Sequence, residues 1–238
     1  MSSSGILVMY KKAKDKPMNS AVLYQWSEMI DKLFPNLGRW QKLTLALFSY
    51  GVVLSRSCTL STVCRHLSGQ ADNGSLERRL QRWLANERLV LQPLFGLWIG
   101  WVLRLWGKAP LLILVDETKL SKHVAVMMVG VAYRASAIPL IWRAYAPDDY
   151  PSEGQVGLMN ALLDHLRAYI PPEQTVLLLA DRGLGTSPTW QQHLSDTGWP
   201  YVLRVQRATR MRLANRPAQR LSHLVGYGQR WTGRAQVF

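Results

Sequence analysis

Apolar residues change their spacing about halfway along the chain. Up to residue 106 they recur every three or four positions, as on one face of an amphipathic helix, whereas from residue 111 they form short runs typical of buried strands. The first pattern predicts helices over residues 22–33, 40–54, 62–67, 75–84 and 98–106. The second predicts strands over residues 111–115, 123–133, 138–145, 175–180 and 201–205.

Two further helices are predicted between the later strands, over residues 153–169 and 188–194. Pro171 and Pro172 end the first of them, and Gly198 ends the second. The resulting order, β-β-β-α-β-α-β, is typical of an α/β fold whose sheet has mixed strand directions. Beyond residue 206 the regular pattern fades into Arg, Gln, Gly and Ala.

The chain is strongly basic, with 29 Lys and Arg against 15 Asp and Glu, a net charge of +14. A surplus of this size favours a polyanionic partner, although a solvated basic surface is the alternative. The charge is concentrated near the end, where residues 201–238 contain no acid and eight arginines: Arg204, Arg207, Arg210, Arg212, Arg216, Arg220, Arg230 and Arg234. Such a segment would repel itself unless a phosphate backbone or an acidic segment faced it.

The cysteines and the apolar stretches indicate a soluble protein of a reducing compartment. Cys58 and Cys64 form neither a zinc pattern nor a disulfide framework. The first residues lack the basic and apolar regions of a signal peptide. The longest uncharged stretch, Leu89–Leu103, is too short and too interrupted by polar residues to span a bilayer. We therefore expect a cytoplasmic location.

A short helix, a turn and a basic helix follow one another in the first half of the chain. Ser61 is the expected N-cap of the short helix, Gly69 ends it, and Asp72–Gly74 forms the turn. The second helix carries three arginines: Arg78, Arg79 and Arg82. This order is the outline of a helix-turn-helix, so these arginines are candidate DNA-binding residues. The alternative is that they form a solvated helix face.

Two of the predicted strands end in an aspartate. Asp116 closes the apolar run 111–115, and Asp181 closes the run 175–180 and is followed by Arg182 and a glycine. If the two strands pair, both carboxylates lie together, and carboxylate oxygens are the ligands that Mg²⁺ prefers. Two such strands suggest a two-metal phosphoryl-transfer site, with Mn²⁺ as a possible substitute metal. The alternative is that each aspartate only caps a loop or a helix.

A two-metal site usually takes a third carboxylate, and the sequence contains no Asp or Glu beyond Asp196. Glu117 directly follows Asp116, so we expect it on the opposite face of an extended strand. The other acids considered lie in a turn or before a helix: Asp148, Asp149 and Glu153. The histidines His123, His165 and His193 lack metal-ligand spacing. Lys119 and Lys122 follow Asp116 closely and are candidates for phosphate contacts or for a solvated role.

Four stretches resemble the IS4 group of DDE transposases, which have a ribonuclease-H-like catalytic core. They are LLILVDETKL with the first acid, TVLLLADRGLG with the second acid, YVLRVQ as the following strand, and SLERRLQRWLAN as the helix before the core. The likeness spans roughly residues 20–206, and the Asp-Arg-Gly element after an apolar strand is its most specific part.

The resemblance implies that Asp116 and Asp181 are two members of a catalytic triad that binds two magnesium ions. It implies DNA strand cleavage at transposon ends by water, followed by attack of the freed 3′-hydroxyl on target DNA. It also implies an N-terminal region that recognises terminal inverted repeats, a homodimer on DNA, and a bacterial, nucleoid-associated location. Arg182, Arg204, Arg207 and Arg210 are expected to contact the DNA.

The sequence departs from this group at the third acid. In the group that acid lies in a pattern Tyr-x2-Arg-x3-Glu-x6-Lys, usually after a β-rich insertion. Tyr201 and Arg204 match its first half, but Ala208 stands at the Glu position and Asn215 at the Lys position. We therefore expect a chain that ends inside the insertion, without the third ligand or the helix that would cover one side of the sheet. Weak or absent catalysis and reduced stability are the expected consequences.

The expected organisation has four parts: a basic flexible leader at 1–20, a helical DNA-binding region at 21–106, a ribonuclease-H-like core at 107–206, and the start of a β-rich insertion at 207–238. Two other functions stay open on the sequence alone. One is a non-catalytic DNA-binding or inhibitory relative of a transposase. The other is a ribonuclease-H-like nuclease, which would need Glu117 or Glu153 as a third acid.

Overall fold

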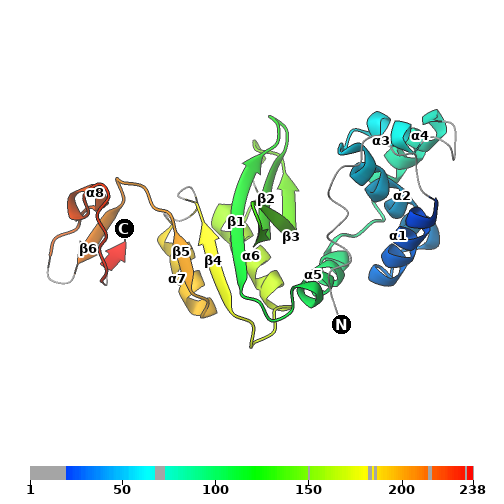
Figure 1. Ribbon diagram of the computed structural model, residues 1–238. Helices are drawn as coiled ribbons and strands as arrows, with labels where there is room; N and C mark the ends of the chain where they lie inside the picture. Colours follow the sequence, from blue (N-terminus) through cyan, green and yellow to red (C-terminus); the bar gives the residue numbers. More distant parts are fainter. Residues whose placement is uncertain are drawn as a thin grey trace. The chain divides into compact units, whose positions relative to one another are not determined.

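The computed structural model of the chain describes residues 20–67, 73–149, 151–181, 184, 187–213, 216–233 and 235–237 (Figure 1). The chain forms two compact units, Met1–Leu97 and Trp98–Phe238. Except for Ser20, the predicted basic leader lies outside the described residues.

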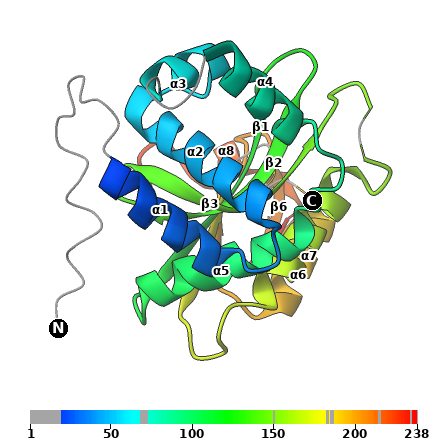
Figure 2. The same ribbon diagram turned by 90° about the vertical axis from the view of Figure 1, so that its right-hand side faces the viewer.

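The first unit is helical. Its helices are α1 (Ser20–Leu33), α2 (Arg39–Ser55), α3 (Leu60–His66), α4 (Asn73–Leu84) and the start of α5 (Gln92–Trp106), which continues into the second unit. The helix α2 packs against α1, α3 and α4, and both Figure 1 and Figure 2 show it between α1 and the α3–α4 pair. The predicted helical N-terminal region is therefore present.

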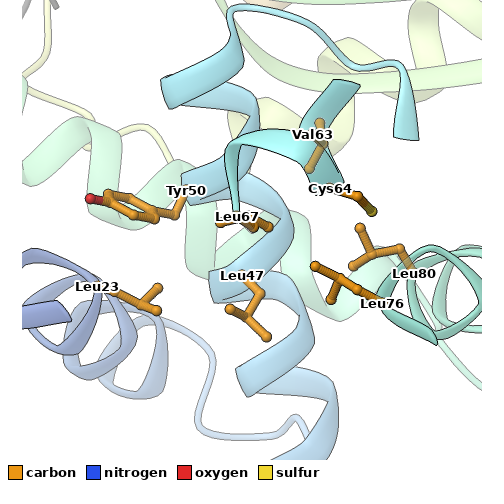
Figure 3. Close-up of a cluster of buried hydrophobic side chains, with 8 residues drawn as sticks. All are labelled: Leu23, Leu47, Tyr50, Val63, Cys64, Leu67, Leu76 and Leu80. Atoms are coloured by element: carbon orange, nitrogen blue, oxygen red, sulfur yellow. The ribbon is translucent and has the colours of Figure 1, made fainter. Parts of the chain in front are cut away.

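A compact apolar cluster joins the helices α1 to α4 (Figure 3). Leu47 and Leu67 lie at its centre, between Leu23 of α1 and the α4 residues Leu76 and Leu80. These side chains recur at three- and four-residue spacing within each helix, which turns one face of each helix inward. Burial of such side chains contributes roughly 1.5–3 kcal/mol each, so the cluster fixes α4 against the other helices.

The second unit contains a five-stranded sheet. Its strands are β1 (Leu111–Lys119), β2 (Ala125–Tyr133), β3 (Ser136–Tyr145), β4 (Val176–Ala180) and β5 (Tyr201–Leu203), in the spatial order β3-β2-β1-β4-β5. The first three form an antiparallel meander, whereas β4 and β5 run parallel to β1. The predicted α/β fold with mixed strand directions is thus confirmed, and so is the predicted order of its elements.

The helix α6 (Gly154–Arg167) follows β3, and α7 (Pro188–Thr197) follows β4. The helix α6 packs against β2, β3 and α7, and Figure 1 shows it behind the meander. Five of its apolar residues are buried: Leu158, Met159, Leu162, Leu163 and Leu166. Their spacing of three and four positions places them on one helix face, so α6 covers one face of the sheet.

The region after β5 contains regular structure that the sequence pattern does not predict in detail. A small antiparallel sheet has the order β7-β6-β8 and consists of β6 (Arg210–Leu213), β7 (Gln219–Arg220) and β8 (Ala235–Val237). A single-turn helix, α8 (Leu221–Leu224), follows β7. The region therefore contains three short strands, and its assignment as the start of an insertion stays a prediction.

Several predicted boundaries in the first unit are wrong by a few residues. The N-cap of α3 is Thr59 rather than Ser61, so the helix begins at Leu60. The helix α4 begins at Asn73, inside the turn that we predicted over Asp72–Gly74, and α5 begins at Gln92 rather than at Trp98. Leu60 of α3 packs against the apolar cluster of the first unit and Phe95 of α5 is buried, so tertiary packing accounts for the earlier starts of these two helices.

Several strand boundaries in the second unit also differ from the prediction, and two of the shifts follow from the geometry of the turns. The strand β2 begins at Ala125, since the Ser121 hydroxyl accepts hydrogen bonds from the backbone N–H groups of His123 and Val124, both at 3.1 Å. The strand β3 starts at Ser136, earlier than predicted, because a left-handed Arg134 (φ 56°) closes a tighter turn. The strand β5 ends at Leu203 rather than at residue 205.

Among the described residues, no single helix is long and apolar enough to cross a membrane. The helices α2 and α3, bent at 88° to each other, reach that length and composition only as a pair.

Candidate active site at the carboxyl edge of the sheet

The two aspartates that follow the apolar runs 111–115 and 175–180 lie at neighbouring positions of the sheet. The strands β1 and β4 are adjacent and parallel, and their register pairs Val115 with Ala180. Asp116, inside β1, and Asp181, directly after β4, each come one residue later, so both occupy the same level across the two strands. Alternation along a strand also places them on one face, opposite to Val115. The sequence analysis placed the two aspartates together only if their strands pair, and the structure shows that β1 and β4 do pair.

Both carboxylates are exposed. The Thr118 hydroxyl donates a hydrogen bond of 2.9 Å to Oδ2 of Asp116. Asp181 forms an ion pair of 3.6 Å with Nη1 of Arg204, which directly follows β5. The two side chains of that pair are 56% and 71% exposed, so the pair is weak and solvent can replace either partner. The two aspartates are thus accessible to a cation or a substrate.

Glu117 lies on the other face of β1, as its position next to Asp116 predicts. Its carboxylate accepts hydrogen bonds from the Tyr145 hydroxyl of β3 and from the Gln155 side chain in the first turn of α6. The helix α6 therefore covers the face that carries Glu117. Both carboxylate oxygens are occupied by neutral donors, so Glu117 is a structural residue of this face and is held away from Asp116 and Asp181.

Glu153 lies at the N-terminus of α6 and pairs with Arg143 of β3 at 2.5 Å. A backbone hydrogen bond holds the pKa of the Glu153 carboxyl below its ordinary value of 4.5, and the nearby Arg143 guanidinium lowers that pKa further. Arg143 is two residues from Tyr145 on β3, so Glu153 also belongs to the face that α6 covers.

Asp116 and Asp181 supply some, but not all, of the ligands that a magnesium site needs. Within the described ranges, no group of three or more His, Cys, Asp or Glu side chains could hold a metal ion. Asp116 and Asp181 provide two hard oxygen ligands, and magnesium is often held by one or two carboxylates that are supplemented by water and substrate phosphates. The pair therefore suits a hydrated cation or a cation shared with a phosphate group.

The remaining acids and the histidines do not join this site. Asp149 closes a turn with a backbone bond of 3.0 Å to Ala146, as the composition around Asp148 and Asp149 predicts. Nε2 of His193 lies 3.2 Å from Oδ1 of Asp164, and the His165 ring contacts the Tyr169 ring. His123 is exposed in the turn between β1 and β2.

The basic residues near the two aspartates differ in their placement. Arg204 is beside Asp181, as described above. Lys119 and Lys122 are exposed at the end of β1 and in the following turn. Lys119 is two residues after Glu117 on β1, and side chains two residues apart on a strand point to the same face. Lys119 therefore lies on the face that α6 covers, opposite to Asp116. Arg182 lies outside the described residues.

The three candidate arginines of α4 do not share one environment. Arg78 and Arg82 are exposed. Arg79 turns inward instead, and its Nε and Nη2 atoms donate hydrogen bonds of 3.2 and 3.0 Å to the Thr44 hydroxyl of α2. Thr44 is only 3% exposed and no sequence signal indicates its role, since it lies 35 positions away from Arg79.

The arginines around the small sheet are exposed where the structure describes their side chains. Nη2 of Arg210 donates a hydrogen bond of 3.3 Å to the backbone oxygen of Ala218. Arg207 lines a shallow hollow together with Arg230 and two exposed aromatic residues, Tyr227 and Trp231. Aromatic residues interspersed among arginines are a sequence pattern found in nucleic-acid-binding surfaces, and the net charge alone does not reveal it.

No protein-family model, no curated protein and no solved structure matches this chain.

Proposed function

We propose that this chain is a transposase of the IS4 group that binds DNA and carries out magnesium-dependent strand cleavage and strand transfer. The observation that carries the proposal is the position of Asp116 and Asp181, which lie at the same level of two adjacent parallel strands and on the same face. Two exposed carboxylates at the same level of adjacent central strands are a suitable arrangement for phosphoryl-transfer chemistry.

The fold supports this proposal at the level of topology. A sheet ordered β3-β2-β1-β4-β5, in which only β2 is antiparallel to the others, is the arrangement expected of a ribonuclease-H-like core. Asp116 lies within the first strand of this sheet, and Asp181 directly follows the fourth. The net charge of +14 favours DNA as the substrate, because the phosphate backbone attracts exposed arginines and lysines.

The residues would share the work as follows. Asp116 and Asp181 hold the magnesium, which when bound activates a water or a 3′-hydroxyl and stabilises the leaving oxygen. Thr118 orients the Asp116 carboxylate through its hydrogen bond. Arg204 neutralises Asp181 while no metal is bound and can turn to a DNA phosphate once a cation replaces it.

The same geometry predicts weak or absent cleavage by this chain alone. Two carboxylates hold one cation readily, but a pair of cations generally needs a third acid. No third acid joins Asp116 and Asp181 among the described residues. This observation also favours the second candidate function, a DNA-binding protein without catalysis that occupies transposon ends.

The third candidate, a ribonuclease-H-like nuclease with all its ligands in this chain, receives less support. Glu117 and Glu153 are the acids that it would need. Both carboxylates are engaged with side chains on the face that α6 covers: Glu117 with Tyr145 and Gln155, and Glu153 with Arg143.

Metal binding and cleavage should be measured together to test the proposal. Isothermal titration with Mn²⁺ should detect binding that falls at least about tenfold in Asp116→Asn and in Asp181→Asn, since each change removes one charged ligand. Asp164→Asn, an exposed aspartate of α6, is the matched control and should bind Mn²⁺ as the wild type does. On inverted-repeat DNA with Mg²⁺, slow nicking that both site variants abolish would support a transposase.

Three results would decide against parts of the proposal. Unchanged Mn²⁺ binding in both site variants would remove the metal site and with it the transposase. DNA binding with Mn²⁺ binding but no nicking at all would favour the non-catalytic protein. Rapid turnover on inverted-repeat DNA would contradict the expected weak activity, and Glu153→Gln would then show whether a third ligand comes from within this chain.

A further inference from the structure

The hairpin of β1 and β2 extends past the neighbouring strand β4, close to the candidate active site. The last residue pair between β1 and β4 joins Val115 to Ala180, whereas β1 continues to Lys119 in its pairing with β2. Figure 1 shows the two strands running beyond β4 to the turn that connects them. The end of the hairpin is therefore a projecting part of the second unit, a few residues beyond Asp116.

Two apolar side chains are exposed at the end of this hairpin. Leu120 is 67% exposed and Val124 is 37% exposed. The N–H of Leu120 donates a bond of 2.9 Å to the backbone oxygen of Val124, which continues the strand pairing and makes the two side chains cross-strand neighbours. Side chains an even number of positions apart on a strand point to one face, so Leu120 faces the same side of the sheet as Asp116.

Hydrogen bonds hold the turn between the two strands in one shape. The Ser121 hydroxyl accepts bonds from the backbone N–H groups of His123 and Val124, both at 3.1 Å. The N–H of Ser121 donates to the backbone oxygen of Val124, also at 3.1 Å. Because these bonds close the turn, Leu120 is carried on an ordered backbone, and little conformational freedom is lost when its side chain enters a partner.

The surroundings of this apolar pair are basic. Lys119 and Lys122 are exposed on either side of Leu120 along the chain, and His123 is exposed beside them. The sequence contains no Asp or Glu from residue 118 to residue 147. Neither lysine has an ion-pair partner in the part of the chain that the structure describes. An apolar tip between cations suits a polyanion with apolar surface inside it, and the stacked bases within the phosphate backbones of duplex DNA are such a partner.

We propose that Leu120 is a wedge that enters a base step of the DNA held at the candidate active site, with Val124 packed against the adjoining sugar. Strand geometry places Leu120 about 13 Å from Asp116 along β1, a distance of about four base pairs along a duplex. The wedge unstacks the duplex at that separation from the phosphate held at Asp116. An unstacked step kinks easily, which lets one DNA strand approach the two carboxylates.

This inference rests on the proposed function for its substrate, DNA, but its test needs neither metal nor cleavage. Binding of the full chain is measured in EDTA at one salt concentration. The probes are two duplexes of equal length and arbitrary sequence that differ in a single mismatched base pair, next to which a 2-aminopurine brightens when its base is unstacked. Because the mismatch has already lost part of its stacking and pairing, the wild type should bind the mismatched duplex about tenfold more tightly and brighten the probe.

Four variants separate the wedge from other effects. Leu120→Ala should bind the two duplexes with an affinity ratio of about one and leave the probe dark, whereas Leu120→Met keeps an apolar wedge and both readouts. Leu105→Ala, the matched control, shortens a leucine of α5 that is 58% exposed and should behave as the wild type does. Lys122→Ala should weaken both duplexes equally, since it removes only a phosphate contact. Circular dichroism checks that each variant keeps its fold.

The outcomes for the wedge and for the proposed function are distinguishable. Equal binding of the two duplexes by the wild type, or a preference that Leu120→Ala keeps, would overturn the wedge. A dimer in sedimentation that Leu120→Ala converts to monomers would overturn it as well, because the tip would then contact a second copy of the chain. A preference lost only in Leu120→Ala, together with unchanged Mn²⁺ binding in Asp116→Asn, would support the wedge while the proposed function fails.

Discussion

The two faces of the five-stranded sheet differ in how completely they are covered. On the face under α6, Ile113 and Val115 of β1 and Leu178 of β4 are at most 2% exposed. On the other face, the residues between them are partly exposed, and Trp142 and Val202 reach 38% and 56%. The face under α6 therefore contributes most of the buried apolar surface of the sheet. The other face is more exposed, so a ligand can reach Asp116 and Asp181 there.

Asp116 and Glu117 show the same contrast at neighbouring positions. The strand alternation turns Glu117 under α6, where Tyr145 and Gln155 bind both carboxylate oxygens. It turns Asp116 to the open face, beside Asp181. Two adjacent acids thus have opposite roles, because one carboxylate is satisfied within the fold and the other is left for solvent, metal or substrate.

Truncation of one buried residue on each face should give the largest difference. Ile113→Ala should lower the free energy of unfolding by about 4 kcal/mol, because it leaves a cavity in a fully buried site. Leu114→Ala, on the open face, should cost about 1–2 kcal/mol, since this side chain is already partly in water. Urea denaturation measures both values, and equal losses would mean that the two faces are covered equally.

Removal of the Glu117 carboxylate should have the next largest effect. Glu117→Ala leaves the Tyr145 hydroxyl and the Gln155 amide without their acceptor, so we expect a loss of about 2 kcal/mol. The control Glu173→Ala, at an exposed loop position, should change stability by less than about 0.5 kcal/mol. A Glu117 variant as stable as this control would show that the network contributes nothing to the covered face.

Asp116→Asn should behave in the opposite way to Glu117→Ala. We expect unchanged or slightly higher stability without metal, because the change removes repulsion between two neighbouring carboxylates. With Mg²⁺ at five times its Kd for the wild type, the wild type should gain about 1 kcal/mol by mass action, and the variant should gain at most about 0.2 kcal/mol. Thermal unfolding with and without Mg²⁺ measures this, and an equal gain in both proteins would place the cation elsewhere.

The smallest effect concerns the Glu153–Arg143 pair at the edge of the covered face. The folded pKa of Glu153 lies below its ordinary value of 4.5, so its contribution is complete above that pH and is lost as the pH falls through the lowered pKa. Arg143→Ala removes part of that lowering and should make the loss of stability below pH 4.5 slightly shallower. Urea titrations at several acidic pH values test this, and a steeper loss would contradict it.

The local spacing of apolar and polar residues determined the types and order of most helices and strands. Apolar runs and three- to four-residue spacing predict the order of elements from α1 to β5, because each pattern reflects the geometry of the element itself. The opposite directions of Asp116 and Glu117 are also local, since strand alternation needs no knowledge of neighbours. Element ends were less accurate, because turns such as that of Ser121 and the packing of whole helices shift them.

Only the tertiary structure decided which distant residues meet. The parallel pairing of β1 with β4 brings together Asp116 and Asp181, which are far apart in sequence. The same kind of long-range packing turns Arg79 toward Thr44 and leaves Arg78 and Arg82 outside, although all three look alike in the sequence. Such contacts depend on how complete elements bury their apolar faces against each other, which no short stretch of sequence contains.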